Sequence, residues 1–271
     1  MSRSVATLWI GPKLSPLEQL SALSLLETGH ELTLYTYEDV QLVPDGVKVA
    51  DARTLLPGPI VRHKKTGSPA LHSDLFRFEL MRQTDATWVD LDVLALRPLP
   101  TDQNHVFAWE NAGSINGAIL KLPKESPALN ALLSYGDNYR GYPPFLPRSK
   151  KIKYQIKTLW RGMTLPELPW GSIGPIGLTH YLKASGEVAY ALPKQSFYPI
   201  DHQDTIQLLT DPTLSRDSFD EGVYAIHFWA SKMRKLVKAQ FNGEIPQHSL
   251  MGREILRMEK KFNLSIGLSL S

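Results

Sequence analysis

Trp88-Val89-Asp90-Leu91-Asp92-Val93 is the stretch that decides the fold, because it is an apolar, largely β-branched run carrying two acids two residues apart. Side chains alternate between the two faces of a strand, so Asp90 and Asp92 are expected to point the same way. Two carboxylates on one side repel each other unless a cation lies between them. Mg²⁺ and Mn²⁺ prefer such oxygen ligands. The stretch therefore predicts a strand that ends in a divalent cation site, and a diphosphate is a common ligand of such a cation.

The acid pair is weak support by itself, since a chain of this Asp content has roughly 0.7 Asp-x-Asp pairs by chance. The preceding residues 71–81 add context, because their apolar positions are typical of a helix. Ser73 or Asp74 suits the N-cap, and Asp74 and Arg77, three residues apart, share a helix face. We expect a capped helix, a short turn at 83–85, and then the strand with its acids.

The first 37 residues predict a strand, a helix and a second strand. Residues 5–10 are almost all apolar, as in a parallel strand buried on both faces, and residues 31–37 alternate. Between them, Ser15 and Glu18 are spaced as a capping box at the start of a helix.

Trp9 and Gly11 lie at the carboxyl end of the first predicted strand. Ligands of open α/β sheets bind beyond that edge. Trp9 and Gly11 are therefore candidates to line a nucleoside pocket, although Trp9 suits the core equally well. No Gly-x-Gly-x-x-Gly or P-loop motif follows any strand, so the phosphates of a nucleotide must be held in another way, which again favours a metal.

The composition is that of a globular protein, with 271 residues, 42% hydrophobic and 21% charged. There is no Cys, so a metal must be bound by oxygen and imidazole. The N-terminus leads directly into a strand-like run, and no later stretch is apolar enough to span a membrane. These features predict a cytoplasmic protein.

The net charge of +3 is unevenly distributed, because residues 148–161 hold six cations and no acid. Apolar Ile152, Ile156, Leu159 and Trp160 recur among them at helical spacing. Two interpretations stay open: a solvated helix whose apolar stripe packs on the core, or a docking surface for an anionic membrane or acceptor, which would place the protein at the inner face of the membrane. Nucleic acid is not expected, because no recognised binding motif accompanies the charge.

A second group of candidate functional residues follows residue 224. His227 stands in the apolar run Ala225-Ile226-His227-Phe228-Trp229, where a histidine is more often a core residue than a metal ligand. Lys232 follows closely and is a candidate to neutralise a diphosphate leaving group.

Ser73-Asp74-x-x-Arg77 followed by Trp88-Val89-Asp90-Leu91-Asp92-Val93 resembles the DxD sugar-binding region of retaining GT-A glycosyltransferases. The family includes initiating mannosyltransferases, α-1,4-galactosyltransferases and bacterial capsular and lipopolysaccharide sugar transferases. The likeness covers residues 71–99. It is supported by Leu8-Trp9-Ile10-Gly11, Asn116-Gly117-Ala118, Gly174-Pro175 and His227-Phe228-Trp229.

The resemblance implies an α/β fold of GT-A type, in which helices flank a Rossmann-like nucleotide-binding sheet. Residues 1–271 would form a single domain. The half over 1–100 would bind the nucleotide sugar and end in the DxD motif, and the half over 101–271 would lie on the acceptor side and supply the late metal and phosphate segment.

The resemblance also implies roles for individual residues. Asp92 and His227 would hold Mn²⁺ or Mg²⁺, with Asp90 on the metal or the ribose, and Asp74 and Arg77 would grip the sugar hydroxyls. Asp90, Asp92, Asp74 and Arg77 are thus the expected catalytic residues. The other expected donor contacts are Trp9, Gly11, Asn116, Trp229 and Lys232, although from the residues alone Asn116 is equally well explained as a turn residue beside Gly117.

The expected function is metal-dependent, retaining transfer of a hexose from a nucleotide diphosphate sugar, with UDP as the expected nucleotide, to a glycan or lipid-linked acceptor in polysaccharide biosynthesis. Two alternatives stay open. One is a metal-dependent phosphodiesterase or nuclease, although such sites gather more carboxylates around two metals. The other is a non-catalytic module that binds nucleotide sugars. The sequence gives no indication of the oligomeric state.

Overall fold

The computed structural model describes residues 3–136 and 138–270, and its strands form two sheets. The larger sheet has six strands in the order β3-β2-β1-β4-β7-β6, and β5 pairs with β8 in a separate ribbon. The strands are β1 (Ser4–Trp9), β2 (Glu31–Thr36), β3 (Lys48–Asp51), β4 (Thr87–Val89), β5 (Val93–Ala95), β6 (Val106–Asn111), β7 (Ser114–Lys121) and β8 (Ala225–His227).

Helices accompany these strands along the whole described chain. The α-helices are α1 (Pro16–Glu27), α2 (Ala70–Gln83), α3 (Pro127–Leu133), α4 (Arg148–Lys157), α5 (Pro175–Ser185), α6 (Gln207–Thr210), α7 (Ala230–Gln240) and α8 (Leu250–Phe262). Short 3₁₀ helices cover Ala52–Thr54, Leu165–Glu167, Glu187–Tyr190, Lys194–Ser196, His202–Asp204 and Arg216–Ser218. The predicted α/β class, with a mostly parallel sheet and flanking helices, is confirmed, while its assignment to the GT-A type stays a prediction.

The chain forms two compact units that interleave in sequence. The first comprises Met1–Asp51, Val89–Gln103 and Pro193–Ser271, and the second comprises Ala52–Trp88 and Asn104–Leu192. The predicted functional halves over 1–100 and 101–271 stay a prediction.

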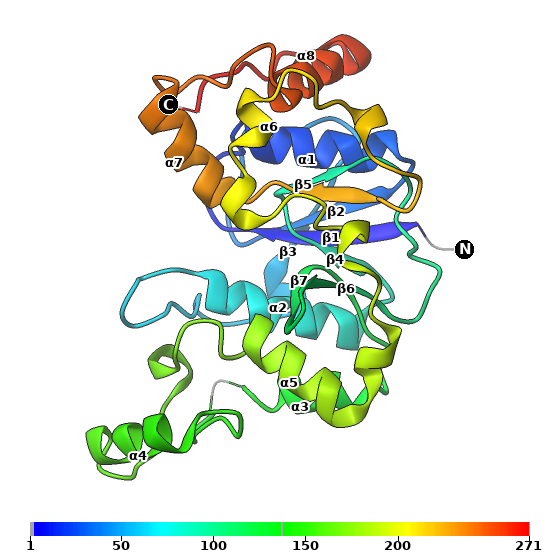
Figure 1. Ribbon diagram of the computed structural model, residues 1–271. Helices are drawn as coiled ribbons and strands as arrows, with labels where there is room; N and C mark the ends of the chain where they lie inside the picture. Colours follow the sequence, from blue (N-terminus) through cyan, green and yellow to red (C-terminus); the bar gives the residue numbers. More distant parts are fainter. Residues whose placement is uncertain (1–2, 137, 271) are drawn as a thin grey trace. The chain divides into compact units, whose positions relative to one another are not determined.

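In the first unit, β1 pairs in parallel with β2, and β2 in parallel with β3. Helix α1 connects β1 to β2, and α8 lies beside α1 (Figure 1). Leucines of α1, among them Leu17, Leu20 and Leu23, are fully buried in a core shared with α7, α8, β5 and β8. Ser24 of α1 also accepts a 2.9 Å hydrogen bond from the Ala95 amide, so α1 anchors β5. The first unit therefore fixes the chain directly after the acid pair.

In the second unit, β6 and β7 pair antiparallel, and α5 packs beside both β7 and α3 (Figure 1). A separate apolar cluster gathers around Leu71 and Leu75 of α2, together with Tyr135, Met163 and Ile173. Helix α2, which carries Asp74 and Arg77, is thus held along its apolar side.

Several predicted elements differ from the observed ones at their boundaries. The expected strand over 88–93 is two strands, because Asp90, Leu91 and Asp92 form a turn between β4 and β5. Helix α2 begins at Ala70, so neither Ser73 nor Asp74 is its N-cap, and Ser68 instead accepts the Ala70 amide at 3.2 Å. By contrast, the predicted capping box of α1 is confirmed, with the Ser15 amide donating to Glu18 Oε2 at 2.9 Å.

Helix α4 corrects one interpretation of the basic stretch. None of its residues is buried, and Ile152 and Ile156 are 54% and 63% exposed. The apolar stripe therefore does not pack on a core. Among the described residues, no helix is both long and apolar enough to cross a bilayer.

Candidate functional site

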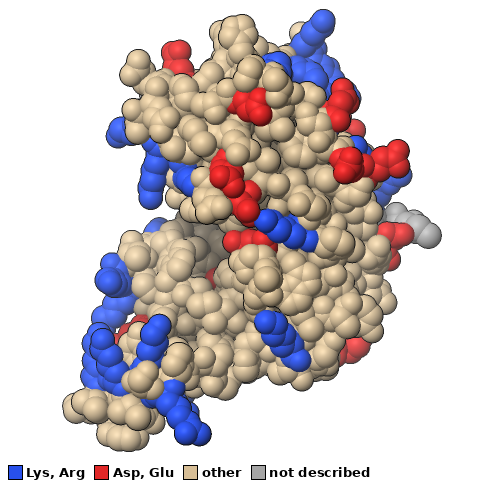
Figure 2. Space-filling model, in the orientation of Figure 1, with Lys and Arg blue, Asp and Glu red and all other residues tan. Residues whose placement is uncertain are grey.

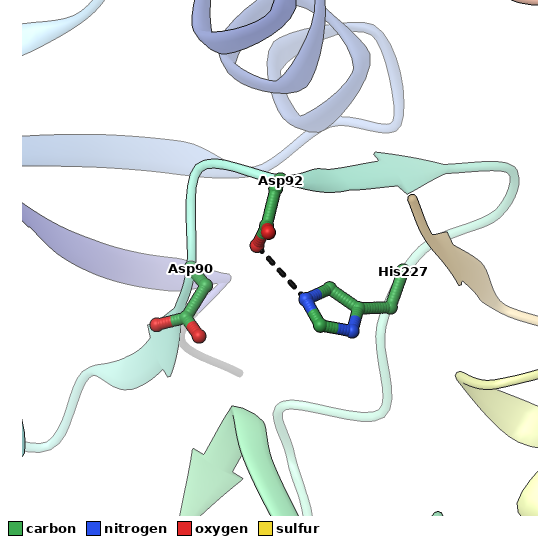
Figure 3. Close-up of side chains that lie close together, drawn as sticks. All are labelled: Asp90, Asp92 and His227. Atoms are coloured by element: carbon green, nitrogen blue, oxygen red, sulfur yellow. Dashed lines mark hydrogen bonds and ion pairs between the residues drawn. The ribbon is translucent and has the colours of Figure 1, made fainter. Parts of the chain in front are cut away.

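Asp90, Asp92 and His227 come together in the first unit, as Figure 3 shows. Each offers one ligand atom, and these atoms lie within 4.8 Å of one another. His227 Nε2 lies 3.0 Å from Asp92 Oδ1. His227 is buried, whereas Asp90 and Asp92 are partly exposed. Among residues 3–136 and 138–270, this is the group of acids and imidazoles that is compact enough to hold a metal ion.

Backbone pairing explains why residues 135 positions apart meet. Strands β5 and β8 run antiparallel with Val93 opposite His227, so the residue before β5 faces the end of β8. The Phe228 amide donates to the Asp92 carbonyl at 2.9 Å, and the Ala230 amide donates to Asp92 Oδ2 at 3.1 Å. Asp92 is thus fixed through both its backbone and its side chain.

The electrostatics of Asp92 favour its ionised form. Burial raises the pKa of the carboxyl, but the charge and hydrogen bond of His227, the Ala230 amide and the charge of Arg234 together lower the pKa below its ordinary value of 3.8. Asp92 is therefore a carboxylate at neutral pH, as a metal ligand must be.

The donor set fits a hard divalent cation. Two ligands on opposite sides of Mg²⁺ lie about 4.2 Å apart, because each bond is about 2.1 Å long. A spread of at most 4.8 Å closes to that value with movements of a few tenths of an ångström. Two carboxylates and one imidazole suit Mn²⁺ or Mg²⁺ better than the thiolate-preferring metals, for which the chain has no Cys.

Trp229 follows His227 in a strained conformation. Its backbone has φ 53° and ψ 59°, in the left-handed region that residues other than glycine rarely adopt. Its ring lies 4.0 Å from the His227 ring, and its buried indole N–H has no partner among the described residues. Strain of about 1–3 kcal/mol and an unsatisfied buried donor are features that concentrate at functional sites.

Trp9 has the same unsatisfied donor. Its buried indole N–H, at the carboxyl end of β1, also has no partner within the described chain. A Cβ at Gly11 would lie 3.2 Å from that nitrogen, so a larger residue there would crowd the indole N–H, whereas glycine leaves room beside it. Both tryptophans predicted to bind the donor thus present a hydrogen-bond donor that the described protein does not use.

Two cations of α7 follow the histidine. Lys232 donates to the carbonyl of His202, whose ring in turn stands edge-on to Trp229 at 5.1 Å. Arg234 pairs with buried Glu18 of α1 and lies 3.3 Å from the Ser15 hydroxyl. Arg234 therefore links α7 to α1, while Lys232 stays a predicted donor contact.

Asp74 and Arg77 lie one turn apart on α2, in the second unit. Their closest charged atoms are 3.6 Å apart, and both side chains are largely buried. Arg77 also donates to the Gly117 carbonyl at 2.9 Å, and its guanidinium lies 5.0 Å from the centre of the Trp88 ring. A guanidinium held in this way is a rigid partner for the carboxylate beside it.

Asn116 is a strand residue, which excludes the turn interpretation. It lies in β7, where Oδ1 accepts the Ala118 amide at 2.8 Å and Nδ2 donates to Glu110 at 3.0 Å. Gly174, at the start of α5, touches Asp74 directly, because a Cβ there would lie 2.8 Å from the carboxylate. The predicted Gly174-Pro175 element thus contacts a predicted sugar-binding residue.

Sequence reasoning missed several groups that shape these sites. The Ala230 amide, the Tyr198 ring, 5.7 Å from His227, and the His202 ring were not predicted. Tyr198 lies outside the helices and strands, and His202 begins a three-residue 3₁₀ helix that is too short for a periodic pattern to predict. A backbone amide leaves no signature in the sequence.

Comparisons with known proteins identify a structural likeness only. No protein-family model matches the chain, and no curated protein matches it. One of the solved structures that match is described as a PaToxG glycosyltransferase. It superposes with a TM-score of 0.42 and 14% identity, over 69% of this chain and 71% of that one. The family resemblance over residues 71–99 stays a prediction.

Proposed function

We propose that this chain is a metal-dependent, retaining glycosyltransferase that moves a hexose from a UDP-sugar to a glycan or lipid-linked acceptor, in the cytoplasm. One observation supports this proposal most directly: the turn after β4 and the end of β8 bring one ligand atom each of Asp90, Asp92 and His227 within 4.8 Å of one another. Asp92 and His227 would hold Mn²⁺ or Mg²⁺, with Asp90 on the metal or the ribose. When bound, the metal supplies Lewis-acid stabilisation of the departing diphosphate.

The unsatisfied donors support a nucleotide ligand in the first unit. The indole N–H groups of Trp9 and Trp229 are buried without a protein partner, so an oxygen-rich ligand would satisfy them. Lys232 would lie against the phosphates, where its charge opposes the charge of the leaving group.

The Asp74–Arg77 pair supports a sugar contact in the second unit. A carboxylate accepts hydrogen bonds from hydroxyls, and its orientation here is set by Arg77 and by the close backbone of Gly174. Asn116 is proposed to contact the same sugar. A transferase needs such fixed polar groups, because its rate depends on holding the donor in one orientation.

Retention of the anomeric configuration is proposed because no dedicated base stands out. An inverting transferase needs a base within about 3 Å of the acceptor hydroxyl. Glu110 already accepts from Asn116 at 3.0 Å, and Asp201 pairs with Lys194 at 2.5 Å. The departing phosphate is therefore proposed to take the acceptor's proton from the same face.

A phosphodiesterase with two metals is less well supported. Such sites use further carboxylates around a second ion. In the described residues, the acids and imidazoles close enough to hold an ion are Asp90, Asp92 and His227.

A panel of nucleotide sugars, incubated with the protein and Mn²⁺ or with EDTA, tests the function. We expect release of UDP from one sugar nucleotide, dependent on the metal, and an α-linked product by proton NMR. Hydrolysis of phosphodiesters instead would support the alternative enzyme, binding without turnover would support a non-catalytic module, and a β-linked product would overturn retention.

A further inference from the structure

Helix α4 carries more exposed apolar surface than its surroundings explain. Ile152 and Ile156, one turn apart, share a face of the helix. Leu159 and Trp160, which follow the C-cap Thr158 of the helix, are 86% and 69% exposed. Tyr154, on the opposite side of the helix, is the residue through which α4 packs against the cluster around Leu71. The four exposed side chains therefore form an apolar edge turned away from the core of their unit.

The backbone after α4 keeps two of these side chains in place. Leu159 and Trp160 have φ angles of 48° and 62°, two successive left-handed residues that are not glycine. The Trp160 amide donates to the Gln155 carbonyl at 2.9 Å, and the Thr158 hydroxyl bonds Tyr142 at 2.6 Å. Hydrogen bonds thus hold the turn in one conformation. The two strained residues of this turn, Leu159 and Trp160, are large, apolar and exposed to solvent.

Cations border this apolar edge. The cations of α4 are Arg148, Lys150, Lys151, Lys153 and Lys157. None of these five forms an ion pair with another described residue, whereas nearby Arg161 is paired with Glu167 at 2.7 Å. Lys153 and Arg148 lie on either side of the face that presents Ile152 and Ile156. Figure 2 shows the blue side chains gathered at the lower left, over α4.

The charges do not serve the helix itself. Cations in the first turn oppose the helix dipole, and the first turn of α4 holds no acid. A helix of ten residues without a buried residue gains little from packing. Between α4 and the loop over 63–66 there is also a cavity of about 680 Å³, lined by Tyr154, Lys157 and Lys65. Both the charge and the apolar edge are therefore explained better by a partner than by stability.

We propose that α4 and the following turn dock on an anionic lipid bilayer, with Ile152, Ile156, Leu159 and Trp160 entering the boundary of the acyl layer and the flanking cations against lipid phosphates. An apolar edge bordered by unpaired Lys and Arg is the pattern that binds such an interface. Docking of α4 does not depend on the proposed sugar transfer.

Flotation of the full chain with lipid vesicles tests the docking surface. We expect binding to vesicles of phosphatidylcholine with phosphatidylserine, weaker binding to phosphatidylcholine alone, and loss of binding as salt is raised. Lys150→Gln with Lys153→Gln, and separately Ile152→Ser with Ile156→Ser, should each weaken binding by on the order of tenfold.

Matched changes elsewhere serve as controls. Lys235→Gln with Lys238→Gln removes two exposed cations of α7, and Val49→Ser removes an exposed apolar residue of β3. These variants should bind vesicles as the unmodified chain does. Equal losses in α4 and control variants, or no binding to anionic vesicles, would overturn the docking surface. So would a concentration-dependent dimer that Ile152→Ser with Ile156→Ser dissociates, because a second copy would then cover the edge.

Discussion

Replacement of Trp229 by phenylalanine separates a donor-binding residue from a core residue. The indole N–H of Trp229 is buried without a partner among the described residues, a situation that costs about 1–3 kcal/mol. Phenylalanine removes this donor and keeps an aromatic ring beside His227. The smaller ring leaves space that costs about 1–2 kcal/mol. The two effects oppose each other, so we expect the free energy of unfolding without ligand to change by about 1 kcal/mol or less.

Binding of a nucleotide should respond differently. A hydrogen bond to a charged oxygen contributes about 1.5–3 kcal/mol. Trp229→Phe should therefore weaken UDP binding in the presence of Mn²⁺ by about 10- to 150-fold, at 1.4 kcal/mol for each factor of ten. Isothermal titration calorimetry measures the affinity, and a thermal melt measures the stability.

Trp160→Phe is the matched control, because Trp160 is 69% exposed and belongs to the other unit. It should leave UDP binding unchanged. If Trp229→Phe also leaves UDP affinity unchanged, Trp229 is not a donor contact, and its strain and unsatisfied N–H need another explanation.

Three further expectations follow from the same contacts. His227→Ala should lower Mn²⁺ affinity by at least 10- to 100-fold, measured by calorimetry, while exposed His248→Ala should not; a destabilised variant with normal Mn²⁺ affinity once folded would make His227 a core residue. Gly174→Ala should push the Asp74 carboxylate, 2.8 Å from the new Cβ, and reduce donor turnover by on the order of 100-fold, whereas Gly222→Ala, with open space around it, serves as a control; equal turnover in both would remove Asp74 from the site. Because the folded pKa of Asp92 lies below 3.8, its contribution to stability is present above that value and is lost as the pH falls through the folded pKa; Asp92→Asn should therefore lose less thermal stability between neutral pH and acid than the unmodified chain, and equal losses would contradict the assignment.

The sequence was most informative where local patterns are strong. Strands β1 and β2 agree with the expected segments 5–10 and 31–37 to within one residue at each end, because their apolar patterns are clear. The sequence predicted the two acids in one strand, because their apolar neighbours are typical of a strand. In the structure the acids lie in a turn, because the chain leaves the large sheet after β4 and β5 pairs with β8 instead.

The remaining features depend on contacts distant in sequence. The meeting of Asp92 with His227 follows from strand register, and the position of Gly174 against Asp74 follows from the packing of α5. No local pattern encodes either contact. The likeness to a known motif suggested that Asp92 and His227 meet, but it did not suggest the contact of Gly174 with Asp74. The sequence also could not predict that α4 is exposed, because an amphipathic pattern does not show whether the apolar side of a helix packs against a core.

Release of UDP from the sugar nucleotide that the panel identifies, measured against Mn²⁺ concentration for the unmodified chain and Asp92→Asn, tests the central claim most directly. The substitution keeps the shape of the side chain but removes a charged oxygen from the group formed with Asp90 and His227. We expect turnover to fall by at least about 100-fold, with a much weaker dependence on Mn²⁺ and a melting temperature within a few degrees. Turnover and Mn²⁺ dependence equal to those of the unmodified chain would contradict the metal site.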